Sequence, residues 1–402
     1  MAAFTPFVGS TVRPEFTRRV PAPAFDSMSG AQRTEYLATH PESYTLVTRS
    51  PGDGGPEDDA GLDRLIELGA EALDRILALN AFETHEQPAF FLYRLCWSGH
   101  VQLGVVGLID STDYLDGHVK RHEQVRTKRA EHLSNHFERL GVHSSPIALG
   151  YRTNPAIRGR LDDILDRTEP FLKFTSGDGL EQAVWLVDDG EDCAALSSLI
   201  APLDLYIMDG HHRAAAAGAL SERVGSPRGD HMLAVLFADD RVNIEPFHRR
   251  VTLDEDTDVE AISAALVDCL GLVESPSLVD SLPEDSGHIG VYLDGTWMCG
   301  ALPDPDSDSP LDATDPVRLQ NQVMGPILGI DPEGAARRIS YFLDDVDRDA
   351  LVQRLGPREI LFVLRAVTPT EVFAVADAGL DMPPKSTYVT PKPRSGVFLH
   401  RF

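Results

Sequence analysis

The sequence predicts an α+β protein, with a mixed α/β core followed by a second, C-terminal α+β unit. A length of 402 residues exceeds what one ordinary hydrophobic core contains. Short apolar runs alternate with helical periodicities up to about residue 252, and a new set of helices and strands starts beyond it. We therefore expect an N-terminal segment with a pocket-closing loop and helix (1–84), the core (85–252) and the C-terminal unit with a basic tail that returns to the core (253–402).

The elements of the core follow from apolar spacing. Apolar residues recur at three- and four-residue intervals over 61–79, which predicts an amphipathic helix. Residues 89–95 and 101–109 are apolar runs joined by a Ser-Gly-His turn, and they predict two paired strands. Further strands are expected at 146–151, 170–174, 182–187, 204–208 and 232–238, and further helices from about 127, at 155–167 and at 211–224.

The C-terminal unit shows the same kinds of pattern on a smaller scale. Its helices are expected at 258–269, 315–327 and 369–377, and its strands at 288–293, 296–302 and 359–366. An acidic loop follows the second of these strands, and the chain ends in a basic, proline-rich tail.

The charge of the chain limits its partners. A net charge of −27 repels phosphate backbones and anionic lipid, so we expect a small-molecule partner and neither nucleic acid nor membrane. The four cysteines are scattered without a CxxC pair, which disfavours a structural zinc site and a disulfide framework. Without an apolar stretch long enough for a signal peptide or membrane helix, the expected location is the cytoplasm.

The stretch "DGHHR" stands where a predicted strand meets a predicted helix. A helix N-terminus presents free N–H groups and the positive end of the helix dipole, which together attract anions. Gly210 would let the backbone approach a phosphate, and Arg213 would supply a planar pair of donors. Asp209 is placed to hold magnesium, and His211 or His212 could donate to a phosphate. The alternative is structural: Asp209 caps the helix, and one histidine faces the core.

A second cluster, "GHVKRHEQVRTKR" at 117–129, is cationic within an acidic chain. Lys120 and Arg126 are candidate phosphate contacts, and Glu123 is a candidate general base or second metal ligand. Two histidines four residues apart could share a metal, but the neighbouring cations disfavour it. The alternative is a solvated helix start with helical ion pairs.

The tail "MPPKSTYVTPKPRSG" ends like a phosphate-binding Walker A loop but lacks the preceding glycines, so that motif is rejected. Its prolines predict a rigid extended segment, on which Lys385, Ser386, Lys392 and Arg394 could reach a substrate carboxylate or phosphate. The alternative is a C-terminal strand that docks on a domain. Near the start, "VPAPAFDSMS" could place Asp26 in a pocket wall, or form only a structural turn.

These four segments resemble the bacterial family called domain of unknown function 1015, over nearly the full length. The family's segments typically read "SPPYDVIS", "KKHEKTR", "ADGHHR" and "MPPKSTYFxPKxxSG"; here they are "APAFDSMS", "KRHEQVR", "MDGHHR" and "MPPKSTYVTPKPRSG". The last two agree closely. Phe25 and Val125 depart from the pattern, since each stands where the family has a hydroxyl group.

The DGHHR stretch is also similar to the signature of the ParB/sulfiredoxin-like superfamily, which includes chromosome-partition CTPases, sulfiredoxin and free-serine kinases. The resemblance implies a ParB/sulfiredoxin-like core that binds nucleotide phosphates. It also implies that Asp209 is a magnesium ligand, that His211 and Arg213 contact phosphate, and that Glu123 activates a hydroxyl group.

Three functions compete on these grounds. The first is a small-molecule kinase that uses Mg²⁺ with ATP or ADP and acts on free serine or a similar hydroxy acid. The second is a nucleotide-binding switch or NTPase of the ParB-like class, which predicts a ligand-driven homodimer. The third, a sulfiredoxin-like redox enzyme, needs a cysteine beside the phosphate turn, and the four cysteines all lie outside the motifs.

Overall fold

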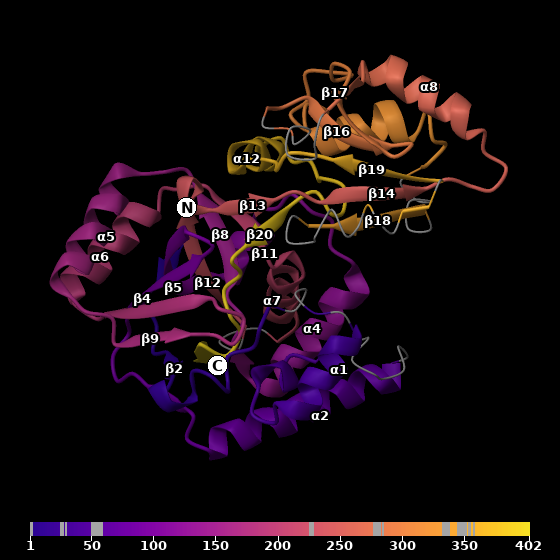
Figure 1. Cartoon of the computed structure of the whole chain (residues 1–402). Coiled ribbons are helices and arrows are strands. Elements are labelled where there is room, and N and C mark those ends of the chain that lie inside the picture. Colours follow the sequence, from indigo (N-terminus) through magenta and orange to yellow (C-terminus); the bar gives the residue numbers. More distant parts are fainter. Residues whose placement is uncertain are drawn as a thin grey trace. The chain divides into compact units, whose positions relative to one another are not determined.

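The computed structural model describes residues 3–402 except for 25–27, 29, 50–58, 225–228, 276–282, 284, 332–337, 344–351, 353–354 and 357. The chain divides into two compact units (Figure 1). The first unit comprises residues 1–121, 125–243 and 391–402, and the second comprises 122–124 and 244–390. The second unit is therefore largely an insertion into the first.

A mixed nine-stranded sheet forms the centre of the first unit. Its strand order is β6-β11-β8-β12-β5-β4-β10-β9, with β1 paired to β5. Most neighbours are antiparallel, and β11 with β6 and β12 with β8 are the parallel pairs. The strands are β1 (Phe4–Thr5), β4 (Phe90–Trp97), β5 (His100–Asp110), β6 (Val119–Lys120), β8 (Ile147–Tyr151), β9 (Leu172–Thr175), β10 (Glu181–Val187), β11 (Leu205–Asp209) and β12 (His231–Ala238).

The main hydrophobic core of this unit joins the sheet to three helices. Ile157 of α5, Leu196 of α6 and Ala214 of α7 are all buried in it, and α5 and α6 lie side by side (Figure 1). The helices of the unit are α1 (Gly30–Thr39), α2 (Asp59–Ala78), α3 (Ser111–Leu115), α4 (Thr127–Leu140), α5 (Pro155–Arg167), α6 (Gly190–Ile200) and α7 (His211–Val224). Short 3-10 helices are η1 (Pro14–Phe16), η3 (Tyr44–Leu46) and η4 (Asp239–Arg241).

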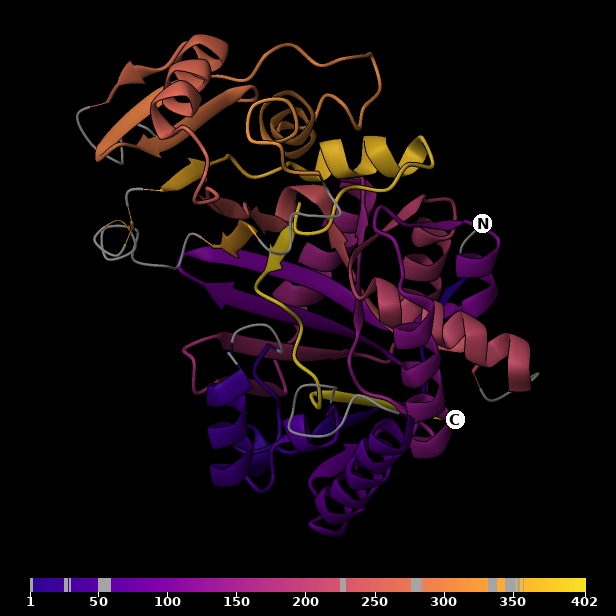
Figure 2. The same ribbon diagram turned by 90° about the vertical axis from the view of Figure 1, so that its right-hand side faces the viewer.

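A four-stranded sheet closes the first unit and uses the last residues of the chain. Its order is β3-β2-β21-β7, with β2 (Ser10–Val12), β3 (Phe82–Thr84), β7 (Val142–His143) and β21 (Phe398–Arg401). The ring of Phe398 packs against Phe91 and Tyr93 of β4, at centroid distances of 5.5 and 5.1 Å. Figure 2 shows the C-terminal segment (yellow) running along this unit to its end.

The second unit contains a six-stranded sheet in the order β15-β17-β16-β19-β14-β18, and β13 pairs with β20. The strands are β13 (Asn243–Glu245), β14 (His248–Thr252), β15 (Val273–Glu274), β16 (His288–Leu293), β17 (Thr296–Ala301), β18 (Ile339–Phe342), β19 (Glu359–Val363) and β20 (Tyr388–Thr390). The helices are α8 (Val259–Leu270), α9 (Asp315–Leu319), the π-helix η6 (Gln320–Met324) and α12 (Pro369–Asp377).

The structure is thus a mixture of helix and sheet, as the sequence predicts. The predicted helix 315–327 is shorter than expected: it passes into the π-helix and stops before Pro326, whose missing N–H group cannot continue a helix. Among the described helices, none has the length and apolar character that crossing a bilayer requires.

Candidate anion-binding site

The strand–helix junction at Asp209 depends on one glycine. Strand β11 ends at Asp209, α7 begins at His211, and Gly210 between them has a φ of +102°. Side chains other than glycine are strained in that region of φ. A Cβ atom at Gly210 would also lie 2.7 Å from Nη2 of Arg213. The glycine therefore allows Arg213 to fold back over the turn.

Asp209 is held between two cations. Nη2 of Arg213 lies 2.5 Å from its Oδ2, and Nζ of Lys392 pairs with its Oδ1. Burial raises the pKa of Asp209, but the charges of Lys392 and Arg213 outweigh burial and hold the pKa well below its usual range. The carboxylate is therefore ionised at neutral pH, and each oxygen atom has a cationic partner.

Helix α4 begins with an unfavourable charge arrangement. Its N-cap, Arg126, makes no side-chain cap, and its first turn holds Lys128 and Arg129 without any acid. Cations at the positive end of a helix dipole typically destabilise the helix by about 0.3–1 kcal/mol each. The same positions become favourable when an anion binds at the helix N-terminus.

Helices α4 and α7 bring their N-termini together. They run in parallel, since Arg223 near the end of α7 contacts Asn135 and Glu138 near the end of α4, and the first residues of the two helices also meet. There, the backbone N–H of Arg126 donates to Nε2 of His212 at 3.2 Å. Two positive helix ends thus face the same region of the first unit.

His212 is a neutral donor at this meeting point. Burial, followed by the charges of Arg129 and Arg126, lowers its pKa to about 4. The ring is therefore uncharged at pH 7, and because Nε2 accepts a hydrogen bond, the proton lies on Nδ1. Its neighbour His211 is almost fully buried, with 4% of its surface exposed.

The charges of the site sum to a marked positive excess. Arg213 and Lys392 flank the carboxylate of Asp209, and Arg126, Lys128 and Arg129 gather at the start of α4, where the charges of Arg129 and Arg126 act on His212. Such a concentration is unusual in a chain with 63 acidic and 36 basic residues. Together with two helix N-termini, it suits a ligand with more than one negative charge, such as a chain of phosphates.

The C-terminal segment that carries Lys392 is anchored by several further contacts. The carbonyl of Pro391 accepts a hydrogen bond from Nε2 of Gln102 at 3.4 Å, and Arg394 forms an ion pair with Asp178. The side chain of Arg394 is only 6% exposed. Gln102 and Asp178 were not predicted from the sequence, because each is an isolated polar residue without a motif around it.

The structure places other predicted residues elsewhere. Nζ of Lys120 lies 3.3 Å from Asp204 and 5.4 Å from the ring centre of Tyr206. Lys120 pairs in register with Tyr206, near the start of β11, whereas Asp209 ends that strand. Three residues of strand span about 10 Å, so Lys120 is not part of this group of cations.

Glu123, Lys385 and Ser386 belong to the second unit. The Ser386 hydroxyl donates to the carbonyl of Pro383 at 2.7 Å and braces a turn, and Nζ of Lys385 lies 4.8 Å above the ring centre of Phe247. A role for these residues beside Asp209 stays a prediction. Asp26 lies outside the described residues, and among the described ones no group of three potential ligands from His, Cys, Asp and Glu could hold a metal.

Three of the four predicted segments touch one another in pairs. Within the first unit, Arg126 contacts His212 and Lys392 contacts Asp209. Within the second, the carbonyl of His122 accepts the N–H of Met382 at 2.7 Å. The segments "KRHEQVR", "DGHHR" and "MPPKSTYVTPKPRSG" are therefore linked although they are far apart in the sequence.

Comparison with known proteins identifies a family but no activity. The family model "Protein of unknown function (DUF1015)" matches residues 4–322. A mutant free serine kinase in complex with ADP is 16% identical, with 70% of this chain and 86% of that chain covered and a TM-score of 0.36. C-terminally truncated SbnI from Staphylococcus aureus is 10% identical, with 72% and 85% covered and a TM-score of 0.37.

A conserved hypothetical protein from Pyrococcus furiosus is also 16% identical, with 71% of this chain and 90% of that chain covered and a TM-score of 0.32. Such scores are too low for these structures to assign a function. No curated protein matches the chain.

Proposed function

The chain belongs to the DUF1015 family, and we propose that it is a nucleotide-dependent phosphotransferase whose phosphate site is the junction of β11 and α7. The acceptor would be a small hydroxy acid such as free serine, and the donor ATP or ADP. One observation carries the proposal: the N-termini of α4 and α7 meet at the contact between Arg126 and His212, amid an excess of cations.

Each part of this group would act on a different part of a phosphate chain. The N–H groups of the first turn of α7 would donate to one phosphate, and the Arg213 guanidinium would bind the same group from the side. The Nδ1–H of His212 would donate without adding charge, because the ring is neutral. Lys128 and Arg129 would neutralise the outer phosphates. Phosphoryl transfer depends mainly on such positioning and charge stabilisation.

Glu123 is our proposed general base, which would take the proton from the acceptor hydroxyl as that oxygen attacks the terminal phosphate. His211 is the proposed second contact to the transferred group. Lys385, Ser386, Lys392 and Arg394 are the proposed contacts to the acceptor carboxylate. These roles rest on the motif resemblance.

The donor set at Asp209 fits magnesium under one condition. Magnesium commonly uses one or two protein carboxylates and completes its shell with phosphate oxygens and water. Asp209 could provide that carboxylate, and the ion would supply charge neutralisation on the phosphates. Since Lys392 and Arg213 already contact the two oxygens of Asp209, a bound cation would have to displace at least one of them.

The same contacts favour a second candidate function, nucleotide binding without phosphate transfer. If Lys392 and Arg213 keep both oxygens of Asp209 engaged, the nucleotide would bind to cations alone and act as a switch. The two functions differ in a simple way, because only the phosphotransferase needs an acceptor and Glu123.

Nucleotide binding by calorimetry tests both candidates, with ATP, ADP and CTP measured with and without Mg²⁺. We expect Arg213→Ala to weaken binding about 10- to 100-fold, the range of a charge-assisted pair of hydrogen bonds. Arg223→Ala is the matched control, since Arg223 lies at the other end of α7, paired with Glu138. Equal losses in both variants, or no binding by the wild type, would refute the proposed site.

Transfer is then measured as phosphoserine formed from ATP and serine, with other hydroxy acids screened as acceptors. We expect Glu123→Gln to abolish transfer and to leave the nucleotide affinity unchanged. Binding without transfer to any acceptor, accompanied by dimerisation, would instead support the switch. Undiminished transfer by Glu123→Gln would exclude Glu123 as the base.

A further inference from the structure

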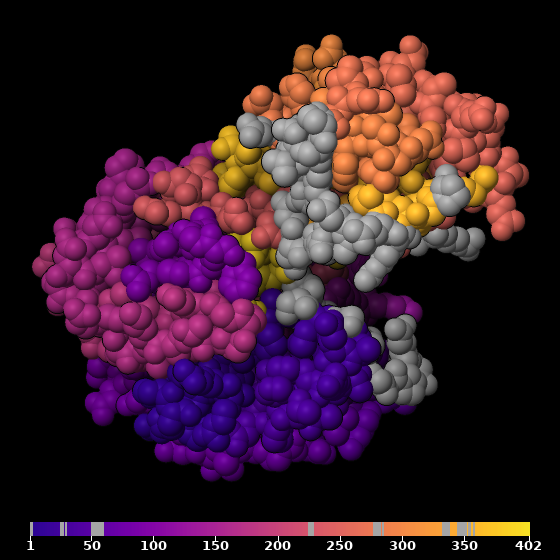
Figure 3. All heavy atoms as spheres, viewed as in Figure 1, coloured from indigo at the N-terminus to yellow at the C-terminus, as the bar shows by residue number. Residues whose placement is uncertain are grey.

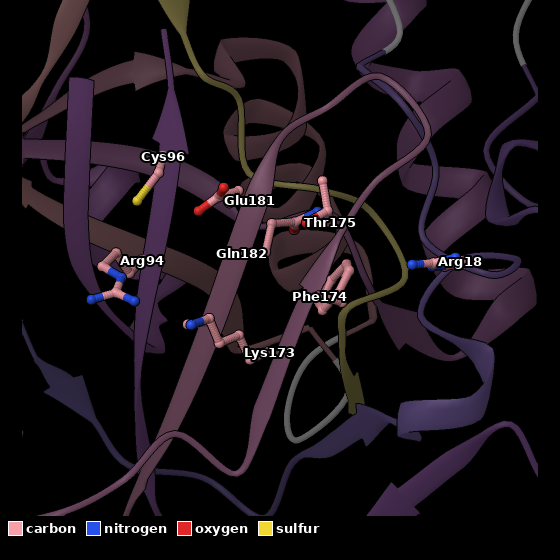
Figure 4. A pocket seen from close by; sticks show the side chains of 9 residues that line it. Arg18, Arg94, Cys96, Lys173, Phe174, Thr175, Glu181 and Gln182 are labelled. Atoms are coloured by element: carbon pink, nitrogen blue, oxygen red, sulfur yellow. The ribbon is translucent and has the colours of Figure 1, made fainter. Parts of the chain in front are cut away.

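A separate cavity of about 420 Å³ lies on the β4–β10–β9 side of the large sheet. Figure 4 shows the side chains of Arg94, Cys96, Lys173 and Glu181 projecting to the same side of these strands. In the space-filling view, the stretch around residues 170–185 (pink-magenta) forms an outer surface of the first unit, next to N-terminal residues (indigo) (Figure 3). The strands that line the cavity therefore lie at the surface of the unit, and the cavity volume is typical of sites for small molecules.

The strand register arranges the lining in two rows. Ala183 of β10 lies directly opposite Arg94 of β4 on one side and opposite Lys173 of β9 on the other. The next row has Glu181 between Cys96 and Thr175. Neighbouring strands are about 4.8 Å apart, so the Cα atoms of Arg94 and Lys173 are separated by about 10 Å across a small alanine.

The two cations of the first row have no acidic partner. Across the described part of the chain, neither Arg94 nor Lys173 makes an ion pair. The Arg94 guanidinium lies 5.0 Å from the ring centre of Trp185, which restricts its position. Unpaired cations facing each other are unexpected in a chain with 63 acidic residues, and Lys173 is one of only five lysines.

We propose that this cavity is a second binding site, for a small organic anion whose carboxylate or phosphate group lies over Ala183 between Arg94 and Lys173. The guanidinium would bind two oxygens of the acidic group. The ammonium would bind a third oxygen, or the same two oxygens from the opposite side. Glu181 in the next row would repel a second acidic group at that end of the ligand. Its carboxylate would instead accept a hydrogen bond from a hydroxyl or amino group of the ligand.

This site is independent of the proposed phosphate site. In the sheet, β5, β12 and β8 separate β4 from β11, which carries Asp209. No residue is shared between the two groups of cations. The second site would therefore remain valid if the phosphotransferase were refuted, and the reverse also holds.

Cys96 provides a direct assay because its half-exposed thiol lines the cavity. The rate of its reaction with a maleimide is followed by mass spectrometry of the full-length protein, digested after quenching. The additives are inorganic phosphate and glycolate, a carboxylate with one hydroxyl group, compared with sodium chloride at equal ionic strength. Cys299, half-exposed in the second unit, serves as the internal reference thiol.

We expect saturable protection of Cys96, with its labelling slowed at least about threefold relative to Cys299, by phosphate, glycolate or both. Protection by one additive alone would assign that acidic group. Arg94→Gln and Lys173→Gln should each abolish protection, whereas Arg213→Ala should leave it intact. No protection in the wild type beyond that of chloride would overturn the proposal, as would full protection in the Arg94→Gln/Lys173→Gln double variant.

Discussion

Replacing Gly210 by alanine tests how much the β11–α7 junction depends on a residue without a side chain. The positive φ of +102° is one penalty, typically about 1–2 kcal/mol for an alanine. The second is steric, since the new Cβ would lie 2.7–3.1 Å from three atoms of the Arg213 guanidinium. Arg213 must then leave Asp209, and a pair of which each side chain is 22–24% exposed contributes about 1 kcal/mol. We expect a total loss of about 2–3 kcal/mol.

Gly117→Ala is the matched control for this measurement. Gly117 also has a positive φ, of +76°, but nothing lies within 4 Å of its Cβ position. It should therefore lose only the backbone part, about 1–2 kcal/mol. Urea unfolding at pH 7, followed by far-UV circular dichroism, gives both free energies, and calorimetry gives the nucleotide affinity. If Gly210→Ala is no less stable than Gly117→Ala and binds nucleotide normally, the described packing of Arg213 on Gly210 is refuted.

Three further predictions concern stability. Burial lowers the pKa of His143 to about 3 and that of His136 to about 4, so both are neutral when folded and take up protons more readily when unfolded. Stability is therefore complete above the unfolded pKa of about 6.5 and should fall by about 1 kcal/mol per histidine from pH 7.5 to 5.5, as urea unfolding at the two values will show. Asp178→Asn leaves the buried Arg394 without its ion pair and should lower the free energy of unfolding in urea by about 2–4 kcal/mol. Asp162→Asn, on the exposed side of α5, should change that free energy by less than about 0.5 kcal/mol. Thr368→Ala removes the capping box of α12 and should cost about 1 kcal/mol, measured as a lower melting temperature, with Thr257→Ala in a surface turn as the control.

Each of these has a contrary outcome. Stability that is flat or rises on acidification would mean that the two histidines are not buried as neutral rings. Equal effects of Asp178→Asn and Asp162→Asn would show that the C-terminal segment is not anchored through Arg394. A melting temperature that Thr368→Ala leaves unchanged would argue against the cap of α12.

Sequence patterns predicted those elements that have a clear apolar spacing within their own residues. The helix α5 and the strands β4 and β5 agree with their apolar spacing to within about two residues. Helix α6 was not predicted, because alanines and serines dilute its apolar face. Strands β2, β3 and β7 were also missed, and a docked C-terminal strand was considered only as an alternative for the tail. Ser10 pairs with Leu399, and two such short segments carry no pattern that identifies a partner so distant in sequence.

In the candidate site too, contacts between neighbouring residues could be predicted from the sequence, whereas contacts between distant segments could not. The Asp209–Gly210–Arg213 turn could be found from sequence because its residues are neighbours in the chain and its geometry needs a glycine. The pairing of Lys392 with Asp209 spans 183 positions and was not predicted, because the sequence analysis assigned Lys392 to a substrate carboxylate or phosphate. Lys120 was assigned to the site by its place in a cationic run, but the register of β6 on β11 directs it to Asp204.

The interrupted first unit has a consequence for how the protein is made on the ribosome. Strand β21 lies between β2 and β7, so the small sheet cannot close until residues 398–401 have been translated. The second unit, an insertion of about 150 residues, is translated before β21, and its synthesis takes roughly 7–30 s at about 5–20 residues per second. During that interval β2 and β7 have an unoccupied place between them, and the nascent first unit exposes strand edges to other chains. Chaperone dependence should therefore be greatest while the second unit is being synthesised.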